Sequence, residues 1–388
     1  MIPMPPSSPA FSTSGVLPNE LYQEIAENLF DPKDRGALFS LALVSKAWSE
    51  HSSRILYREF YDHWVHEYGR SKVLLAHTGF LLAVINNPTR YGPLVQTYVQ
   101  IGFMNMPGYR NQDTAHVQGL TAKALPVMVN LQHLQVISKG TGPIPSNFLD
   151  GCTFRLRSLT LLFVLDLHKF FDFLRSQPEM QHLQIGSFGP SPSQTDLSGL
   201  PEDVCPNLLS ASCAYESMAR VYKRRKLMGL ETMLDFAAME RLGLSPYTVD
   251  VGKLKYLSLW IQTGRRPTSL ITLMGSNIDI LKLQSNDPEA VVNQISVWHL
   301  PNLRLIIILD DHSTSGEPSF QQTLIDTFNR LPSLHYVVVQ GFAMMDLVDF
   351  RWSISKRDYD GRVSELWRER IHIQRNTIEL WWTVYDNV

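Results

Sequence analysis

One pattern of apolar residues recurs between residues 131 and 339, and it constrains the fold more than any other feature. The pattern reads apolar-x-x-apolar-x-apolar, and we call each occurrence a frame. Alternating apolar residues are typical of strands, and helical stretches such as 167–177 and 320–330 fall between the frames. The frames are Leu131/Leu134/Val136, Leu156/Leu159/Leu161, Met180/Leu183/Ile185, Leu208/Ala211/Cys213, Leu254/Leu257/Leu259, Ile278/Leu281/Leu283, Leu303/Ile306/Ile308 and Leu334/Val337/Val339.

The frames follow one another at nearly constant spacing. First positions 131, 156, 180 and 208 are 25, 24 and 28 residues apart, and first positions 254, 278, 303 and 334 are 24, 25 and 31 apart. The interval from 208 to 254 is 46 residues, which predicts one degenerate repeat within it. A strand plus a helix at about this period resembles the leucine-rich repeat, in which neighbouring units stack because no unit closes its own core. We therefore expect an α/β fold with an irregular leucine-rich-repeat-like β/α solenoid over residues 65–350.

The repeats depart from the usual leucine-rich consensus. Its asparagine is present at Asn286, while Lys139, Val164 and Asp311 occupy the position elsewhere. A doubly wound α/β domain is the alternative, since it also alternates strands and helices, but fixed spacing favours the solenoid. Residues 351–388 leave the period and are expected to cap its last unit, with strands around Ile371 to Leu380.

A second constraint lies near the amino end, where three short helices are expected. Pro18 suits a first helical turn, Asp31-Pro32 breaks and restarts the chain, and Ser45 can cap a third helix that is expected to extend to Trp64. Apolar stripes at helical spacing are formed by Leu21, Ile25 and Leu29 and by Leu38, Leu41 and Val44. Three such helices cannot bury these broad stripes alone, so a partner face is expected.

This order of residues resembles an F-box over roughly residues 16 to 60, from Leu-Pro through Val-Ser-Lys-Ala-Trp to Leu-Tyr. The resemblance implies docking on the Skp-type linker subunit of a cullin-containing ubiquitin ligase. With the repeats behind it, the chain resembles the fungal type of F-box substrate adaptor. The resemblance assigns linker binding to Leu17, Pro18, Leu21, Ile25, Leu29, Leu38, Leu41, Val44 and Trp48. The expected organisation is a disordered leader at 1–14, an F-box-like module at 15–64, the solenoid at 65–350 and a cap at 351–388.

Side chains alternate faces along a strand, so the residues on either side of each frame's second position share the opposite face. We call this the flanking face; its members are polar in early frames and apolar in late ones. An apolar patch on an otherwise wet surface marks either a partner site or a place that the C-terminal residues cover. Our hypothesis is that an unidentified protein substrate docks there. The expected contacts are Leu305, Ile307, Tyr336 and Val338, with Tyr256 and Lys282 beside them.

The bulk composition narrows the function. The chain has 388 residues and a net charge of −2, which gives no basic field for nucleic acid or membrane surfaces. No apolar run approaches the roughly 18 residues of a membrane span. Three cysteines without a C-x-x-C pair suit a reduced compartment, so a cytoplasmic or nuclear location is expected.

Catalytic motifs are not found, and we expect no enzyme, cofactor or metal. Asp310-Asp311-His312 fits a polar turn after a strand better than a metal or acid–base site. His133 and His182 lie two periods apart, too far for one metal, and the basic run 223–226 fits solvated surface better than an import signal. A recognition protein whose helices only cap the solenoid remains the alternative to a ligase adaptor.

Overall fold

The structure of the chain is a computed structural model that separates into two compact units, Met1–Phe60 and Tyr61–Val388. No helix in the part of the chain it describes has the length and apolar character needed to cross a bilayer. The described residues are 18–30, 34–62, 70–100, 111–137, 148–162, 167–186, 200–214, 225–234, 254–261, 277–285, 300–310, 318–342, 350–357 and 363–370.

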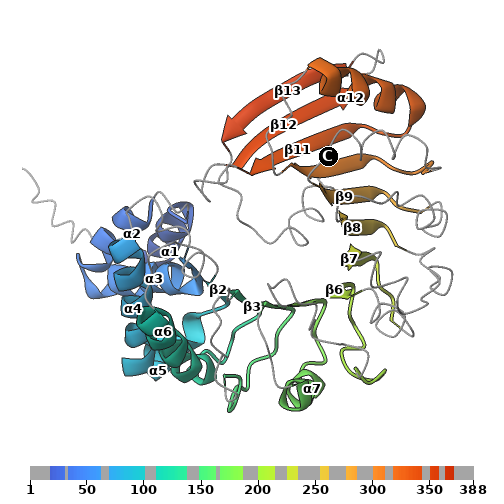
Figure 1. Cartoon of the computed structure of the whole chain (residues 1–388). Coiled ribbons are helices and arrows are strands. Elements are labelled where there is room, and N and C mark those ends of the chain that lie inside the picture. Colours follow the sequence, from blue (N-terminus) through green and yellow to red (C-terminus); the bar gives the residue numbers. More distant parts are fainter. Residues whose placement is uncertain are drawn as a thin grey trace, which may run out of the picture. The chain divides into compact units, whose positions relative to one another are not determined.

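The first unit is built from helices α1 (Asn19–Asn28), α2 (Arg35–Ala42) and α3 (Lys46–Arg58) (Figure 1). Pro18 is the residue before α1 and not inside its first turn. The expected extension of the third helix to Trp64 is wrong, because α3 ends at Arg58 and the short strand β1 (Glu59–Tyr61) follows at once. The expected break at Asp31-Pro32 lies outside the described residues.

The second unit begins with helices before its sheet. Helix α4 (Arg70–Asn86) comes first, and Pro88 opens α5 (Pro88–Tyr91) at a position where its missing N–H costs nothing. The 3-10 turn η3 (Gly92–Leu94) needs its glycine, since a Cβ at Gly92 would lie 2.2 Å from the carbonyl oxygen of Val127. Strand β2 (Thr97–Gln100), helix α6 (Asn111–Ala124) and the 3-10 turn η5 (Leu125–Val127) follow.

A buried polar network joins α4, β2 and α6. The hydroxyl of Tyr98 lies 2.6 Å from Nε2 of His77, donates to Oε1 of Gln100 at 3.0 Å and lies 3.0 Å from Oγ1 of Thr121. All four side chains are fully buried. Burial lowers the pKa of His77 to about 3, so the imidazole is neutral at physiological pH. The network therefore ties three elements together through uncharged hydrogen bonds.

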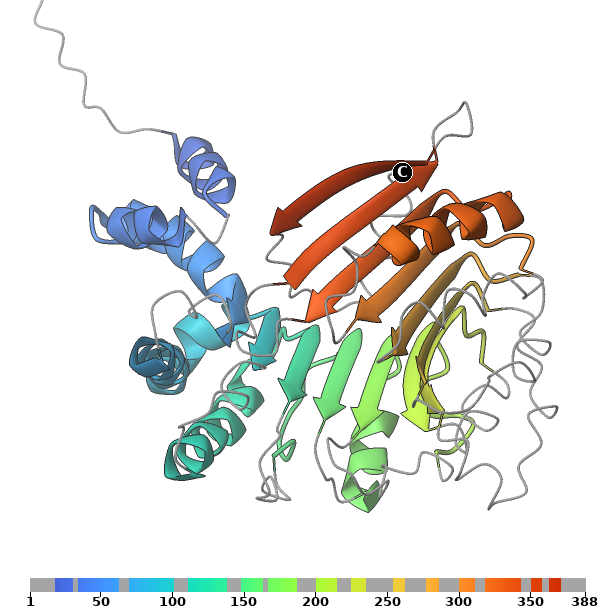
Figure 2. The ribbon, with the colours of Figure 1, turned by 45° about the horizontal axis from the view of Figure 1, so that its top comes forward.

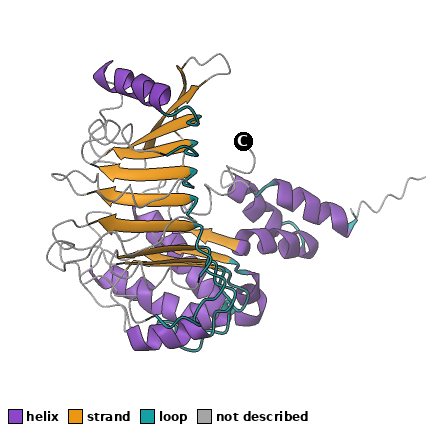
Figure 3. Ribbon diagram, turned by 90° about the vertical axis from the view of Figure 1, so that its right-hand side faces the viewer, coloured by secondary structure: helices purple, strands orange, loops and turns teal. Residues whose placement is uncertain are grey.

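A sheet of thirteen strands runs in chain order from β1 to β13. Figures 1 to 3 show its strands lying side by side. Every neighbouring pair from β2 to β11 is parallel. Its later strands are β3 (His133–Ile137), β4 (Ser158–Leu162), β5 (His182–Gly186), β6 (Ser210–Ala214), β7 (Gly229–Leu234), β8 (Tyr256–Ile261), β9 (Ile280–Ser285), β10 (Leu305–Asp310), β11 (Tyr336–Phe342), β12 (Phe350–Arg357) and β13 (Val363–Arg370).

The register of these strands follows the frames. Leu134 pairs with Leu159, which pairs with Leu183, and the same row continues through the second position of every later frame. First positions are buried as well, from Leu131 to Leu334, both at 0 % exposure. Equivalent apolar residues thus stack on one another along the sheet, which is why the pattern repeats in the sequence.

Strand β7 occupies the long interval between residues 208 and 254. Its register places Leu230 between Ala211 and Leu257, and Leu227 is buried three residues earlier, as a first position should be. The degenerate repeat expected there is present as a strand, although Thr232 stands where the third apolar residue is usual.

Side chains also connect consecutive repeats by donating hydrogen bonds to backbone carbonyls, mostly those of prolines. Asn130 donates to the carbonyl of Pro93 at 2.7 Å, and Asn207 donates to that of Pro178 at 3.0 Å. Arg225 donates to the carbonyls of Pro201 and Val204, each at 2.8 Å. These bonds satisfy turn carbonyls that helix or strand pairing leaves open.

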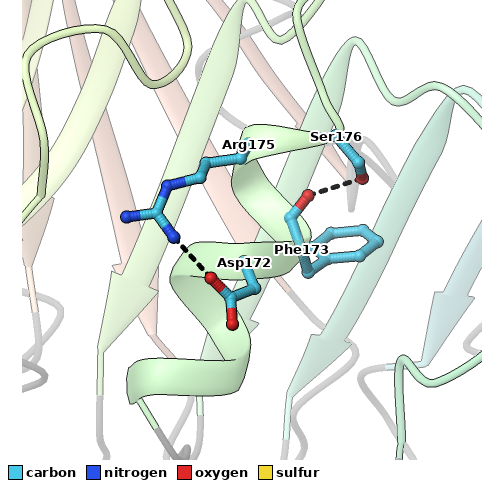
Figure 4. A network of polar contacts seen from close by, with 4 residues as sticks. All are labelled: Asp172, Phe173, Arg175 and Ser176. Atoms are coloured by element: carbon cyan, nitrogen blue, oxygen red, sulfur yellow. Dashed lines mark hydrogen bonds and ion pairs between the residues drawn. The ribbon is translucent and has the colours of Figure 1, made fainter.

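Helices α7 (Leu167–Arg175) and α12 (Pro318–Arg330) lie where helical stretches were expected. Figure 4 shows the end of α7, where Arg175 forms an exposed ion pair with Asp172 and the hydroxyl of Ser176 donates to the carbonyl of Phe173 at 2.6 Å. The exposed pair contributes little, so α7 is held mainly by buried residues such as Phe170 and Leu174.

The parallel arrangement ends after β11. Strand β12 pairs antiparallel with β11, and β13 pairs antiparallel with β12, with a bulge between Ile354 and Ser355. The strands expected around Ile371 to Leu380 lie outside the described residues.

Candidate functional site

Helix α1 presents apolar side chains to the outside. Leu21 is 39 % exposed and Ile25 is 38 % exposed, whereas Tyr22 and Ala26 on the other side of the helix are buried. Pro18, which precedes the helix, is also exposed. The outer side of α1 therefore carries apolar surface that its own unit leaves uncovered.

The end of α2 and the turn after it expose more apolar surface. Phe39 is 61 % exposed, Leu43 is 75 % exposed and Val44 is 68 % exposed. Leu38, one residue before Phe39, is by contrast 1 % exposed and belongs to the core of the unit. We call Leu21, Ile25, Phe39, Leu43 and Val44 the apolar docking residues, because their exposure makes them the candidates for contact with a partner.

The buried core of this helical unit does not include the apolar docking residues. Ala26, Leu38 and Ile55 form its buried centre, with Leu29, Phe30 and Leu56 packed against it. The ring of Tyr22 meets that of Trp48 edge-on, with centroids 4.7 Å apart. Each of the three helices thus contributes one residue to the buried centre, and the apolar docking residues are not part of it.

Helix α3 is fixed at both ends. The backbone N–H of Trp48 donates to Oγ of Ser45 at 3.3 Å, so the expected cap at Ser45 is confirmed. At the other end Arg35 donates to the carbonyls of Leu56 at 2.8 Å and Glu59 at 3.4 Å. Burial lowers the pKa of Arg35, and the charge of Glu59 partly opposes this shift. The half-buried guanidinium of Arg35 in α2 therefore anchors the carboxyl end of α3.

The expected linker-binding residues divide by exposure. Pro18, Leu21, Ile25 and Val44 are exposed, Leu29, Leu41 and Trp48 are half-buried, and Leu17 lies outside the described residues. Leu38 is buried at 1 % exposure and is a core residue, so its side chain cannot present surface to a partner. The sequence analysis missed Phe39 and Leu43, although they stand four residues apart on one helical stripe. In Leu38–Val44 nearly every position is apolar, so periodicity could not tell the outer stripe from the inner one.

The residues of the flanking face lie in register on neighbouring strands, but most of their side chains are buried. Ile307 is 0 % exposed, Tyr256 is 1 %, Val338 is 5 %, Lys282 is 6 % and Leu305 is 8 %, while Tyr336 is half-buried. The expected wet apolar patch at these residues is therefore wrong as a description of exposure. Substrate contact there stays a prediction, and it requires these side chains to become accessible.

Polar residues on the flanking face bond to one another across strands. Nδ1 of His182 lies 2.7 Å from Oγ of Ser210, and Thr160 donates to Oε1 of Gln184 at 3.3 Å. His133 and His182 are separated by Ser158 in the same row. The two histidines are thus on alternate strands, as their spacing indicated.

The other candidate groups are the acidic turn after β10, the basic run and the histidines. Within the described ranges, no three His, Cys, Asp or Glu side chains are grouped to hold a metal ion. Asp310 ends β10, and Asp311 and His312 lie outside the described residues. Arg225 is buried at 6 % exposure, so the expected solvated surface is wrong for this member of the basic run.

The thiols of Cys152 and Cys205 are free. Burial and Asp150 raise the pKa of Cys152 to about 12. Burial raises the pKa of Cys205 to about 12 as well, against the opposing charge of Arg225. Neither thiol is a ready nucleophile at neutral pH, because the thiolate is the reactive form.

Comparison with known proteins identifies the segment that carries the apolar docking residues. A search of curated proteins found no match for the chain. Residues 15–63 match the family model described as F-box-like, so the N-terminal helices with their exposed apolar residues form an F-box-like domain.

Proposed function

We propose that this chain is a substrate-recognition adaptor of a Skp-cullin-F-box ubiquitin ligase. Its F-box-like domain docks on the Skp-type linker subunit, and through it on a cullin, while the repeat region binds a protein substrate. The observation that carries the proposal is the coincidence of the F-box-like match at 15–63 with five exposed apolar side chains in the same segment.

Exposed apolar residues on a small helical unit are a physical argument for a partner. Leu43 and Val44 each leave more than half of their surface in water. Transfer of such side chains into an interface yields about 25 cal/mol for each Å² of apolar surface buried. Central apolar anchors of this kind dominate the energy of many interfaces.

The mechanism in this proposal is scaffolding. An adaptor adds no reacting group; it holds a substrate beside the ligase's ubiquitin donor and raises the rate through proximity. The repeats support this role as a leucine-rich-repeat-like solenoid, since consecutive in-register strands make one extended platform. The role places the chain in the cytoplasm or the nucleus.

Co-purification with the linker subunit tests the proposal. The full chain should retain the linker, and a Leu43→Glu/Val44→Glu variant should lose it, because two charges would replace exposed apolar anchors. Leu75→Glu/Leu82→Glu makes the same change at exposed positions of α4, outside the F-box-like domain, and should retain the linker. Failure of the unsubstituted chain to bind any Skp-type linker would favour the alternative, a recognition protein whose helices only cap the solenoid.

Substrate capture is a separate measurement. Affinity capture under proteasome inhibition should enrich proteins that are ubiquitinated in the presence of the intact chain. The docking variant Leu43→Glu/Val44→Glu should still capture them but should not support their ubiquitination. If substrate capture requires the linker subunit, the proposal that the F-box-like domain binds the linker and the repeat region binds the substrate is contradicted.

A further inference from the structure

Two buried polar groups on neighbouring strands have no hydrogen-bond partner among the described residues. They are the Oε2 atom of Glu231 on β7 and the hydroxyl of Tyr256 on β8. The side chain of Tyr256 is 1 % exposed, whereas that of Glu231 is half-buried. Buried polar atoms are paired in more than about nine cases in ten, so two together on adjacent strands call for an explanation.

The register brings these two groups to the same part of the flanking face. Gly229 pairs with Tyr256, and Glu231 pairs with Ser258, two residues further along each strand. Because residues two apart share a face, Tyr256 and Glu231 are diagonal neighbours on it. Gly229 pairs with Tyr256 and contributes no side chain to the row in which Tyr256 lies. Figure 1 shows β7 and β8 next to each other.

The charge at this place is negative. Burial is the main cause that raises the pKa of Tyr256 well above its usual value, and the carboxylate of Glu231 adds to it. Ser258 lies close enough to the phenol to oppose this shift, although the hydroxyl has no hydrogen bond of good geometry. Tyr256 therefore stays protonated, so its hydroxyl can donate one hydrogen bond and its oxygen can accept another, beside a carboxylate that only accepts.

The nearest candidate for a counter-charge on this face is Lys282. It lies in the same row as Glu231, with Ser258 between them, and makes interactions of its own. No ion pair joins the carboxylate of Glu231 to a basic side chain in the described part of the chain. Two oxygen acceptors, one of them charged, suit a cationic donor better than any neutral group.

We propose that Glu231 and Tyr256 form a binding site for the ammonium or guanidinium group of a basic side chain on the substrate. The residue Glu231 is half-buried while its Oε2 atom and Tyr256 are buried, so the cation would approach beside Glu231 and the hydroxyl of Tyr256 would accept a further hydrogen bond at the buried end. The inference rests on the proposed function only in taking the ligand to be a protein substrate. The binding of a cation by these two side chains depends on the sheet alone.

Peptide binding to the full chain tests the site. The probes are short peptides with randomised flanks and a fixed central Lys, Arg, norleucine, Gln or Glu. Peptides with a central Lys or Arg should be retained about tenfold better than those with norleucine or Gln, the factor that one charge-assisted hydrogen bond supplies. The ratio between Lys and Arg peptides shows which of the two cations the site prefers.

Two variants locate the preference. Glu231→Gln should abolish it, and Tyr256→Phe should weaken it, since the ring is kept and only the hydroxyl is lost. Glu179→Gln makes the same acid-to-amide change at an exposed position outside the site and should keep the preference. Thermal unfolding of each variant shows that it is folded.

The outcomes separate this site from the adaptor role. A wild-type chain without preference for basic peptides overturns the site, and so does a preference that survives in Glu231→Gln. If Glu231→Gln does not fold, a preference unchanged in Tyr256→Phe overturns it instead. If the unsubstituted chain fails to bind the linker, the adaptor role is refuted, but the result of the peptide experiment is unaffected.

Discussion

The ring of Tyr22 on α1 meets the ring of Trp48 on α3 edge-on, with 4.7 Å between their centroids. Tyr22 also stacks on His51 one turn further along α3, at 6.1 Å. These contacts hold the inner side of α1 against α3, so Leu21 and Ile25 must face away. Trp48, which the F-box resemblance assigns to the linker, thus acts inside the domain as a support for the docking residues.

We expect Trp48→Ala to loosen α1 without removing a docking residue. Loss of the edge-on aromatic pair and of its apolar area should cost about 2 kcal/mol, less than a fully buried tryptophan because Trp48 is half-buried. Hydrogen exchange of the α1 amides in the full chain should become faster. Phe39→Ala is the control: it removes an exposed ring and should leave this exchange unchanged while it weakens linker binding.

Leu38→Ala and Leu43→Ala should have opposite consequences, although the chemical change is the same. Leu38 is 1 % exposed, so its truncation should cost about 2–4 kcal/mol of stability through the cavity it leaves. Leu43 is 75 % exposed, so its truncation should change stability little but reduce linker affinity. Urea unfolding and linker titration of both variants measure this. Similar stability losses would show that Leu43 belongs to the core.

Acid should destabilise the second unit through His77. Its folded pKa is about 3, below the usual value of 6.5, so between these pH values the unfolded chain binds a proton that the folded chain does not. This contribution to stability is present above pH 6.5 and is lost as pH falls, by at most about 1.4 kcal/mol per pH unit. His77→Gln should therefore flatten the pH dependence of unfolding between pH 6.5 and 4.5. His116→Gln, at an exposed position, should leave the slope as it is.

Removal of residues 352–388 should give insoluble protein. Strands β12 and β13 cover the edge of β11, and their loss would expose the N–H and C=O groups of a strand that reads Tyr-Val-Val-Val. Removal of residues 1–14 should leave solubility unchanged. A soluble chain that lacks 352–388 and melts cooperatively would show that the last strands are not a cap.

Charge substitutions on the flanking face should separate structure from recognition. Ile307→Lys places a charge at a position with 0 % exposure and should cost several kcal/mol, so linker binding and substrate capture would both suffer. Tyr336→Lys changes a half-buried residue in the neighbouring strand and is the informative substitution. If Tyr336→Lys lowers substrate capture and keeps linker binding, the expected substrate contact is supported.

Much of the strand arrangement could be predicted because it rests on a local pattern. The second positions Leu134, Leu159 and Leu183 stand directly opposite one another, as equal spacing required. The strand at 229–234 was expected only from the long interval between two frames. Gly229 and Thr232 interrupt the alternation of apolar residues that marks the other strands. The end of α3 at Arg58 was missed, because its carboxyl end is fixed by Arg35, 21 residues before Leu56, and not by a local stop signal.

The residue pattern predicted the repeated strands, their order along the sheet, and an apolar stripe near the amino end that three short helices could not cover. Packing selected which stripe stays uncovered: Leu38 turns inward onto Ala26 and Ile55, and Phe39 and Leu43 are left in water. It also decided that Ile307 and Tyr256 are enclosed. The physical reason is that periodicity reports which residues share a side of an element, whereas burial depends on what packs against that side.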